Sequence, residues 1–118
     1  MVKVTMVLAS GPHNPDGDLN DRIEMQVALT ANVHLDASAW EEGREPWLVV
    51  RDRVGRPSRI SEMVKIDDGW ALRTVDGEDD PLSSLSASII RPGEIVVLTR
   101  PKGDALTYRI VAVESATP

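Results

Sequence analysis

The sequence predicts a mainly β protein: a small antiparallel sandwich or barrel of about seven strands with one or two short helices. Short runs in which apolar and polar residues alternate recur along the chain, and turns rich in Gly, Pro and Asp separate them. The chain has no Phe, one Tyr and three Trp, so aliphatic residues and four Met must fill its core. Because β-branched Val and Ile favour strands, the composition supports the same fold class. We expect a single domain covering residues 1–118.

The longest alternating run covers residues 23–36, IEMQVALTANVHLD, in which every second side chain from Ile23 to Leu35 is apolar. Period two predicts a strand with one buried and one solvated face. An unbroken strand of this length would span roughly 45 Å, so we expect a bend or bulge near Ala31 and Asn32. Residues 2–8 alternate in the same way and predict a first strand, connected to the second by a long loop.

Further strands are predicted at residues 46–53, 59–66, 70–75, 94–100 and 105–114. Turn sequences separate them at residues 55–57, 67–69, 76–77, 92–93 and 101–104. The second half of the last strand is apolar on both faces, which favours a central place in the sheet. An open sheet of such strands has unpaired edges, and pairing with another copy or another protein is one way to cover them.

Two short segments have helix signals. Ser38 lies three residues before Glu41, as in a capping box, and Gly43 follows as a stop signal. Together they predict one or two helical turns. Asp80-Pro81 is a second helix start. The apolar residues that would face inward from this second helix are Leu82, Leu85 and Ile89.

The bulk composition excludes several classes of function. A net charge of −6 and a pI near 4.8 argue against general affinity for nucleic acid or for an acidic membrane. The absence of Cys excludes disulfides, thiolate nucleophiles and Cys-ligated metals. The apolar run at residues 4–9 is too short for a signal peptide or a membrane span. We therefore expect a cytoplasmic protein without a cofactor.

The opening loop resembles a cation-binding loop at first sight, because side-chain oxygens recur at alternate positions: Asn14, Asp16, Asp18 and Asn20. A calcium loop of the EF-hand type also needs Gly at its sixth position and Glu at its twelfth, and neither possible register supplies them. The same residue types satisfy their own backbone in turns. The acidic clusters at residues 67–68 and 76–80 also coincide with turns. We predict no metal site.

A catalytic triad or an imidazole–metal site would have to use His13 or His34, which are the only histidines. A small hydrolase or isomerase would bring His34 near Asp16 or Asp18 as a general base or metal ligand. The alternative, which we favour, is a strand histidine and a loop histidine without a catalytic role. The sequence has no nucleophile elbow, zinc-protease motif, phosphate-binding loop or dinucleotide fingerprint.

One segment, RDRVGRPSR, forms a local basic patch on an acidic chain, with its guanidinium groups at Arg51, Arg53, Arg56 and Arg59. The first two share a strand face and the others flank a turn, which allows all four to converge. Guanidinium groups suit phosphate or carboxylate, so this patch is a candidate site for a nucleotide, a nucleic-acid backbone or an acidic partner. The alternative is a solvated hairpin whose arginines pair with Asp52, Glu62 and their neighbours.

The three tryptophans are Trp40, Trp47 and Trp70. In a chain without Phe we expect them to anchor the core. The alternative is an exposed recognition face, because Trp and Arg are enriched at binding hot spots. The candidate binding residues are therefore Trp40, Trp47, Arg51, Arg53, Arg56 and Arg59.

The first functional hypothesis is a non-catalytic β module that binds another protein or another copy of itself, as a small component of a larger assembly. The second is an anion- or phosphate-binding module that uses the Arg51–Arg59 patch. The third is the hydrolase or isomerase built on His34. A protein partner or a homo-oligomer is expected under the first hypothesis, with no membrane association and no nucleic acid.

Overall fold

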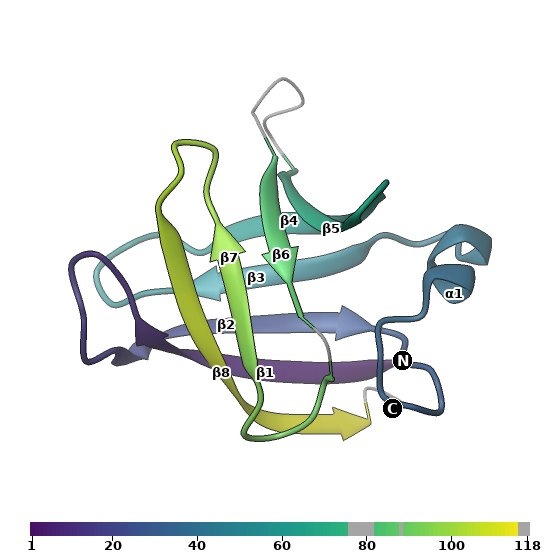
Figure 1. Cartoon of the computed structure of the whole chain (residues 1–118), viewed down its shortest axis with the longest axis horizontal. Helices are drawn as coiled ribbons and strands as arrows, with labels where there is room; N and C mark the ends of the chain where they lie inside the picture. Colours follow the sequence, from purple (N-terminus) through teal and green to yellow (C-terminus); the bar gives the residue numbers. More distant parts are fainter. Residues whose placement is uncertain (76–81, 88, 116–118) are drawn as a thin grey trace.

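The computed structural model describes residues 1–75, 82–87 and 89–115. Eight antiparallel strands form a closed barrel in which each strand pairs with its neighbours in the sequence and β8 returns to β1 (Figure 1). The strands are β1 (Val2–Ser10), β2 (Asp18–Val27), β3 (Trp47–Asp52), β4 (Arg59–Ile66), β5 (Gly69–Thr74), β6 (Ser83–Ser86), β7 (Ile95–Thr99) and β8 (Ala105–Ser115). The predicted mainly β fold is confirmed, in its barrel form. Because all eight described strands are paired on both sides, the predicted unpaired edges do not occur among them.

Alternation along each strand sends one set of side chains into the barrel. In β1 and β2 these are Val4, Met6 and Leu8 and, facing them, Ile23, Met25 and Val27, all of which are buried. The other strands contribute Trp47, Val49, Met63, Leu72, Leu85, Val96, Leu98, Leu106, Tyr108 and Ile110 to the same core. Two successive side chains of a strand point to opposite faces, so a period-two sequence produces a filled interior and a solvated exterior.

The predicted strand over residues 23–36 is correct only as far as Val27. Beyond it the chain makes a tight turn, in which the Thr30 amide donates to the His34 carbonyl at 2.8 Å and the Val33 amide donates to the Thr30 carbonyl at 3.0 Å. Leu29 and Leu35 form a single bridge and pack against the core. The alternation after Val27 therefore came from a loop with two inward leucines, and the strand prediction there was wrong.

The first predicted helix is present as α1 (Ala37–Glu42). Its N-cap is Asp36, whose carboxylate accepts a hydrogen bond from the Ala39 amide at 3.1 Å, and not Ser38. The second predicted helix is wrong in its described part, because Ser83–Ser86 is strand β6. Leu85 points into the barrel there. The helix start at residues 80–81 and the turn at residues 76–77 lie outside the described residues.

The predicted turns explain most of the connections. Asp67 and Asp68 form the two-residue loop of the β4–β5 hairpin. Gly93 has φ of 95° in a turn closed by a 3.2 Å hydrogen bond from the Glu94 amide to the Arg91 carbonyl, as the Pro-Gly pair predicts. The turn at residues 101–104 joins β7 to β8.

The last strand owes its two apolar faces to a β-bulge and not to a central place in an open sheet. Thr5 pairs with Ala112 while Met6 pairs with Ile110, so Val111 is the extra residue. Val111 is exposed, and the shift of one residue turns Val113 toward the core. The bulge thus reverses the inward and outward positions along β8.

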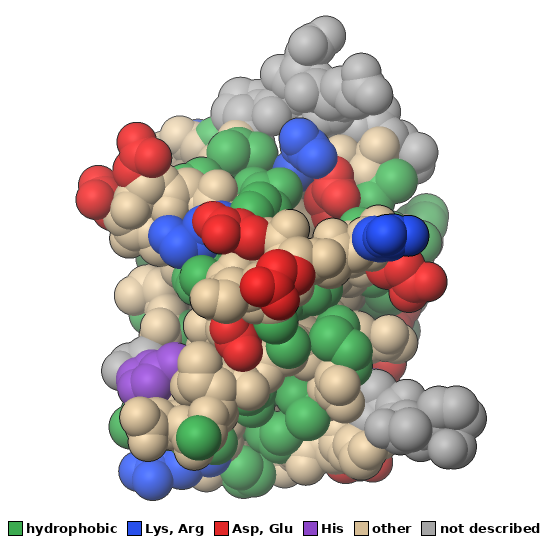
Figure 2. Space-filling model, turned by 90° about the vertical axis from the view of Figure 1, so that its right-hand side faces the viewer, with side chains coloured by type: hydrophobic (Ala, Val, Ile, Leu, Met, Phe, Trp, Pro, Cys, Tyr) green, Lys and Arg blue, Asp and Glu red, His purple; other side chains and the backbone are tan. Residues whose placement is uncertain are grey.

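Tryptophan side chains and α1 close one end of the barrel. Trp47 stacks on Trp70 with ring centroids 5.5 Å apart, and Trp40 meets Trp70 edge-on at 6.1 Å. The Trp40 indole N–H donates to the Met63 carbonyl at 2.9 Å, which ties α1 to β4. Seen from this end, the surface carries acidic, basic and hydrophobic side chains side by side (Figure 2). The predicted role of the tryptophans as core anchors fits this packing.

Within the described ranges, no helix has the length and apolar character needed to cross a lipid bilayer.

Candidate functional site: a basic mouth at the open end of the barrel

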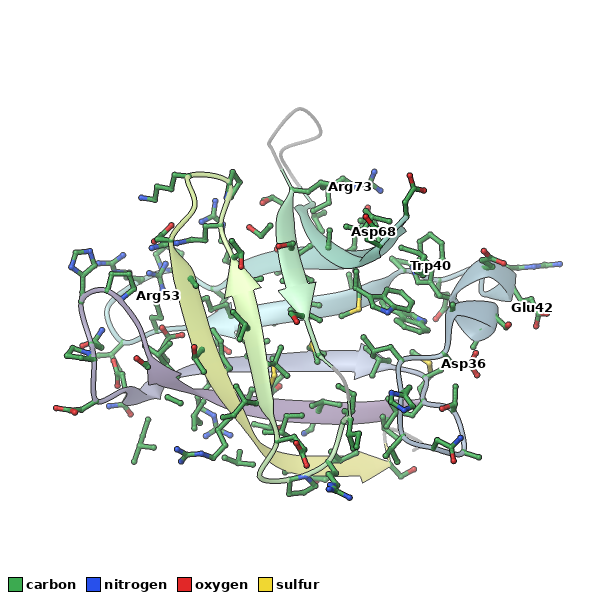
Figure 3. The ribbon with its side chains drawn as sticks, viewed as in Figure 1. Asp36, Trp40, Glu42, Arg53, Asp68 and Arg73 are labelled. Atoms are coloured by element: carbon green, nitrogen blue, oxygen red, sulfur yellow. The ribbon has the colours of Figure 1, made fainter. Side chains whose placement is uncertain are left out.

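The site is built by the same inward alternation that builds the core. Toward one end of the barrel, the inward positions change from aliphatic to polar residues. Along β3 the order is Trp47, Val49 and then Arg51, and along β2 Asp21 follows the same period as Ile23. Trp47 and Arg51 therefore lie at opposite ends of one strand. Figure 3 shows the two ends of the barrel, with Trp40 at the α1 end and Arg53 at the other end.

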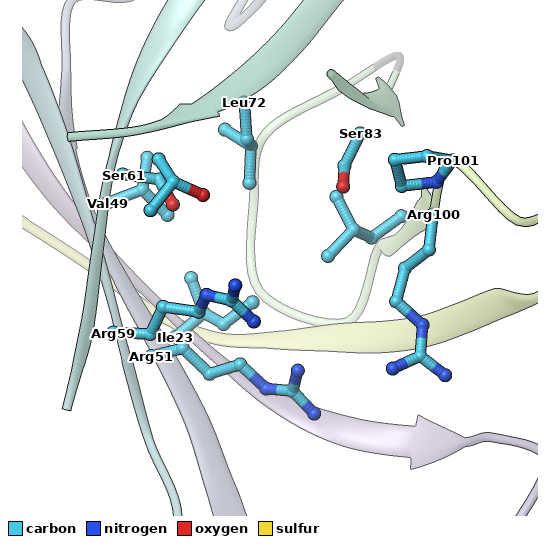
Figure 4. Close-up of a pocket in the computed structure, with 11 residues that line it drawn as sticks. Ile23, Val49, Arg51, Arg59, Ser61, Leu72, Ser83, Arg100 and Pro101 are labelled. Atoms are coloured by element: carbon cyan, nitrogen blue, oxygen red, sulfur yellow. The ribbon is translucent and has the colours of Figure 1, made fainter. Parts of the chain in front are cut away.

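A cavity of about 310 Å³ opens at this end, and we call it the inner cavity. Its apolar wall is formed by Ile23, Val49, Leu72, Leu98 and Pro101. Its polar lining consists of three hydroxyl residues, Ser61, Thr74 and Ser83, and three arginines, Arg51, Arg59 and Arg100. In Figure 4 the guanidinium groups of Arg51 and Arg59 lie side by side, and that of Arg100 faces them from the other side. Arg51 and Arg59 are also direct partners in the β3–β4 register.

Arg51 is held in place by a buried carboxylate. Its Nε and Nη2 atoms donate to the two oxygens of Asp21 at 3.0 and 2.8 Å, a bidentate geometry. The Tyr108 hydroxyl donates to Asp21 Oδ1 at 3.0 Å. Asp21 and Tyr108 are both almost completely buried, at 4% and 0% exposure. These contacts fix the Arg51 guanidinium at the mouth before any ligand arrives.

The environment shifts the pKa values of both partners of Asp21. Burial alone lowers the pKa of Arg51, but the hydrogen bond to Asp21, together with the electrostatic effects of Tyr108 and Asp21, raises it above its ordinary value. Burial raises the pKa of Tyr108 well above its ordinary value of 10.0; the Asp21 charge adds to the increase and Arg51 opposes it. Arg51 stays charged and Tyr108 stays neutral at ordinary pH.

The other two arginines of the inner cavity differ in their pairing. Arg100 forms an ion pair with Asp104 across the β7–β8 turn. The Nε atom of Arg100 and the Oδ1 atom of Asp104 are buried and have no hydrogen-bond partner among the described residues. Arg59 has neither an ion pair nor a side-chain hydrogen bond within the described part of the chain. Its charge is therefore available to a ligand.

A second hollow of about 470 Å³, the outer pocket, adjoins the inner cavity. Its basic lining residues are Arg51, Arg53, Arg56, Arg100 and Lys102, and its acidic ones are Asp18 and Asp21. The pKa of Arg53 is lowered, first by partial burial and then by the positive charges of Arg51 and Arg56. The shared lining of the outer pocket places these three guanidinium groups close to one another.

The structure divides the candidate binding residues predicted from the sequence into two groups. It brings Arg51, Arg53 and Arg56 together at the outer pocket and places Arg59 beside Arg51 in the inner cavity. Trp40 and Trp47 belong to the packed cluster at the opposite end and do not join the arginines. No single surface therefore contains all six candidates.

The alternative pairing of the arginines with Asp52 and Glu62 is not found. Asp52 accepts a hydrogen bond from Ser58, and Glu62 forms an ion pair with Arg73. Within residues 1–75, 82–87 and 89–115, neither Arg53 nor Arg56 has an ion-pair partner. Three of the four arginines of the basic patch thus have no ion pair with a described residue.

The structure separates His34 from the opening loop, which the catalytic alternative would have to bring to it. Asp18 is the first residue of β2, whereas His34 follows the last residue of that strand, so the two lie at opposite ends of the barrel. His13 lines the outer pocket instead.

The opening loop satisfies its own backbone. The Asn20 amide donates to the Asp18 carboxylate at 2.9 Å and the Gly17 amide donates to the Asn14 carbonyl at 2.9 Å. In the parts of the chain that are described, no group of three or more His, Asp or Glu side chains is placed to hold a metal ion.

Sequence reasoning missed Asp21, Arg100 and Lys102 as members of the site. Asp21 has a local signal, because it continues the inward period of Ile23 and Met25. Arg100 and Lys102 have none, since they reach the mouth only through closure of the barrel.

No family model, no curated protein and no solved structure matches this chain.

Proposed function

We propose that the protein binds a small organic anion at the open end of its barrel. The observation that carries the proposal is the convergence of Arg51, Arg59 and Arg100 on one cavity that also has an aliphatic wall. Guanidinium groups present donors in a planar fork that matches a carboxylate or phosphate. The aliphatic wall supplies apolar contact for the rest of the ligand, as in typical small-molecule sites.

The electrostatics of the mouth support an anionic ligand over a neutral one. The protein has a net charge of −6, yet the outer pocket is lined by five basic and two acidic side chains. Partial burial, followed by the positive charges of Arg51 and Arg56, lowers the pKa of Arg53, and a bound anion would offset those charges. The Arg51 side chain in the cavity is only 14% exposed, and such burial strengthens the attraction between a guanidinium and a bound anion.

The packing of the site supports binding without large rearrangement. Arg51 is oriented by Asp21, and Asp21 is oriented by Tyr108. A side chain that is already fixed loses little conformational entropy when it meets a ligand. Tight anchoring of the guanidinium therefore favours affinity.

Titration calorimetry with butyrate and with inorganic phosphate, at low ionic strength, tests this function. We expect Arg59→Gln to weaken butyrate binding about tenfold, because it removes a charge-assisted hydrogen bond. Arg91→Gln is the matched control, since it removes the same charge from an exposed ion pair with Glu94, in the turn before β7. If neither anion binds, or if both variants bind butyrate as the wild type does, the proposed function is wrong.

A second candidate function, self-association or protein binding, rests on an aliphatic patch on the outer face of β3–β5. Val50 lies opposite Ile60, and the Val75 amide donates to the Ile60 carbonyl. Leu48, Ile60 and Val75 are exposed. Size-exclusion chromatography with light scattering on the wild type and on Ile60→Glu tests it: a concentration-dependent dimer that the variant abolishes supports this function, and a strict monomer at high concentration removes self-association. A cytoplasmic location and a foreign protein partner stay predictions of the sequence.

A further inference from the structure

The inner cavity and the outer pocket share a wall. Arg51 and Arg100 line both of them, so these two side chains form the boundary between the hollows. A ligand group bound at this boundary would contact the guanidinium groups of both Arg51 and Arg100. The two hollows together therefore resemble one site with two compartments, and the compartments differ in charge and in polarity.

The difference in charge follows from which basic side chains already have acidic partners. In the inner cavity Arg51 is paired with Asp21 and Arg100 with Asp104, which leaves Arg59 uncompensated. In the outer pocket three further basic side chains have no ion-pair partner among the described residues: Arg53, Arg56 and Lys102. The outer pocket is thus suited to a group with more than one negative charge, such as a phosphoryl group with a charge of about −1.5 to −2 at neutral pH.

The difference in polarity concerns the rest of the ligand. Five apolar side chains and three hydroxyl residues line the inner cavity, and none of its lining residues is acidic. Its volume of about 310 Å³ is at the small end of the range for ligand pockets. It therefore suits a compact body of a few carbon atoms that offers apolar surface to Leu72 and Leu98 and oxygen acceptors to the hydroxyls.

From these observations we infer that the ligand is a phosphomonoester of a compact organic body. Its phosphoryl group lies in the outer pocket against Arg53, Arg56 and Lys102, and its body extends past Arg51 into the inner cavity. This inference rests on the proposed function and specifies the ligand class of the same site.

Four probes separate the two compartments: inorganic phosphate, n-butyl phosphate, butyrate and n-butanol, each titrated by calorimetry at low ionic strength. We expect n-butyl phosphate to bind about tenfold more tightly than phosphate, because the butyl chain buries apolar surface that phosphate lacks. Butyrate is expected to bind more weakly than n-butyl phosphate, and n-butanol more weakly still, since it has no charge for the arginines.

Variants of each compartment provide independent readouts. The double variant Arg53→Gln/Arg56→Gln is expected to weaken the binding of phosphate and of n-butyl phosphate by a similar factor, about tenfold or more. Its effect on the affinity for butyrate should be much smaller. The matched control is Arg73→Gln/Arg91→Gln, which removes the same charge from two exposed ion pairs. Ser83→Phe fills the inner cavity without changing its charge. The affinity for n-butyl phosphate should therefore fall to the affinity for inorganic phosphate. If Ser83→Phe does not fold, Ser61→Leu serves the same purpose.

The outcomes distinguish this inference from the proposed function. The inference of a ligand that occupies both compartments is wrong if n-butyl phosphate binds no more tightly than phosphate, or if filling the inner cavity does not change its affinity. The proposal that the mouth binds an anion would still hold in either case. If a single-stranded oligonucleotide binds as tightly as n-butyl phosphate, the outer pocket recognises the phosphate of a macromolecule. The inference of a compact phosphomonoester is then wrong. If no anion binds at all, both proposals fall together.

Discussion

Arg51 and Asp21, thirty residues apart in the sequence, meet through two hydrogen bonds of 3.0 and 2.8 Å just inside the mouth of the barrel. The side chain of Asp21 is 5% exposed and that of Arg51 is 14% exposed, so water screens the pair only weakly. The pair has two effects on the site. It fixes the direction of the Arg51 guanidinium. It also balances the positive charge of Arg51, which would otherwise add to the positive charges of Arg53 and Arg59.

Asp21→Asn is expected to lower the free energy of unfolding by about 3 kcal/mol, because it leaves the Arg51 guanidinium largely buried without a counter-charge. Urea denaturation followed by circular dichroism measures the change. Glu94→Gln is the control: Glu94 pairs with Arg91 on the surface, and the loss of such a pair costs about 0.5 kcal/mol or less. Equal unfolding midpoints for Asp21→Asn and the wild type would show that the buried pair contributes no stability.

Tyr108 is the only tyrosine, so the near-ultraviolet absorbance of tyrosinate reports its ionisation alone. Because burial raises its pKa above the ordinary 10.0, the folded protein keeps the proton at a pH where the unfolded chain has lost it. The resulting stability is present in full below about pH 10 and is lost as the pH rises through the raised pKa. We expect the absorbance change in an alkaline titration to be delayed past pH 10 and to coincide with unfolding.

Tyr108→Phe provides the matching stability measurement. At neutral pH we expect it to lower the free energy of unfolding by about 2 kcal/mol, since it removes a hydrogen bond to a charged acceptor while keeping the ring in the core. Above about pH 10 the wild type loses the stability that comes from the raised pKa of Tyr108, whereas the variant has no tyrosine to ionise. The two unfolding free energies should therefore converge. Curves that stay parallel across this pH range would contradict the assignment.

Period two in the sequence was enough to predict seven of the eight described strands, because the pleat of a strand forces successive side chains to opposite faces. The exception is the short strand β6, which was predicted as a helix. The same signal failed after Val27. Leu29 and Leu35 both pack inward from a loop, and a loop can place alternate side chains on the core without extended backbone. The prediction left a sandwich and a barrel as alternatives, because no local pattern specifies that β1 pairs with β8.

The site was predictable only where its residues are close in the sequence. Arg51, Arg53, Arg56 and Arg59 stand out as a basic run on an acidic chain. Arg100 approaches them only because β7 and β8 return to the start of the barrel. Asp21 contacts Tyr108 across 87 residues of sequence, and such a contact has no signature in a single sequence.

The two ends of the barrel should behave independently. Trp47 is 3% exposed and stacks on Trp70, so Trp47→Ala is expected to cost about 3–5 kcal/mol of stability. Since the tryptophan cluster lies at the end opposite the arginines, the variant should bind n-butyl phosphate with unchanged affinity wherever it remains folded. Trp40→Phe is a milder control that loses the hydrogen bond to the Met63 carbonyl. A tenfold loss of affinity in either variant would reveal coupling between the two ends.

The opening loop should tolerate no side chain at Gly17. This residue has φ of 84°, and a Cβ placed there would lie 2.5 Å from the Leu8 carbonyl oxygen in β1. Gly55 has a similar φ of 74° but has open space around its Cα. Gly55→Ala therefore measures backbone strain alone, about 1 kcal/mol, whereas Gly17→Ala adds a clash with backbone that cannot move without disturbing β1. Chemical denaturation should rank Gly17→Ala as clearly the less stable of the two, and equal stabilities would refute the close packing of the loop against β1.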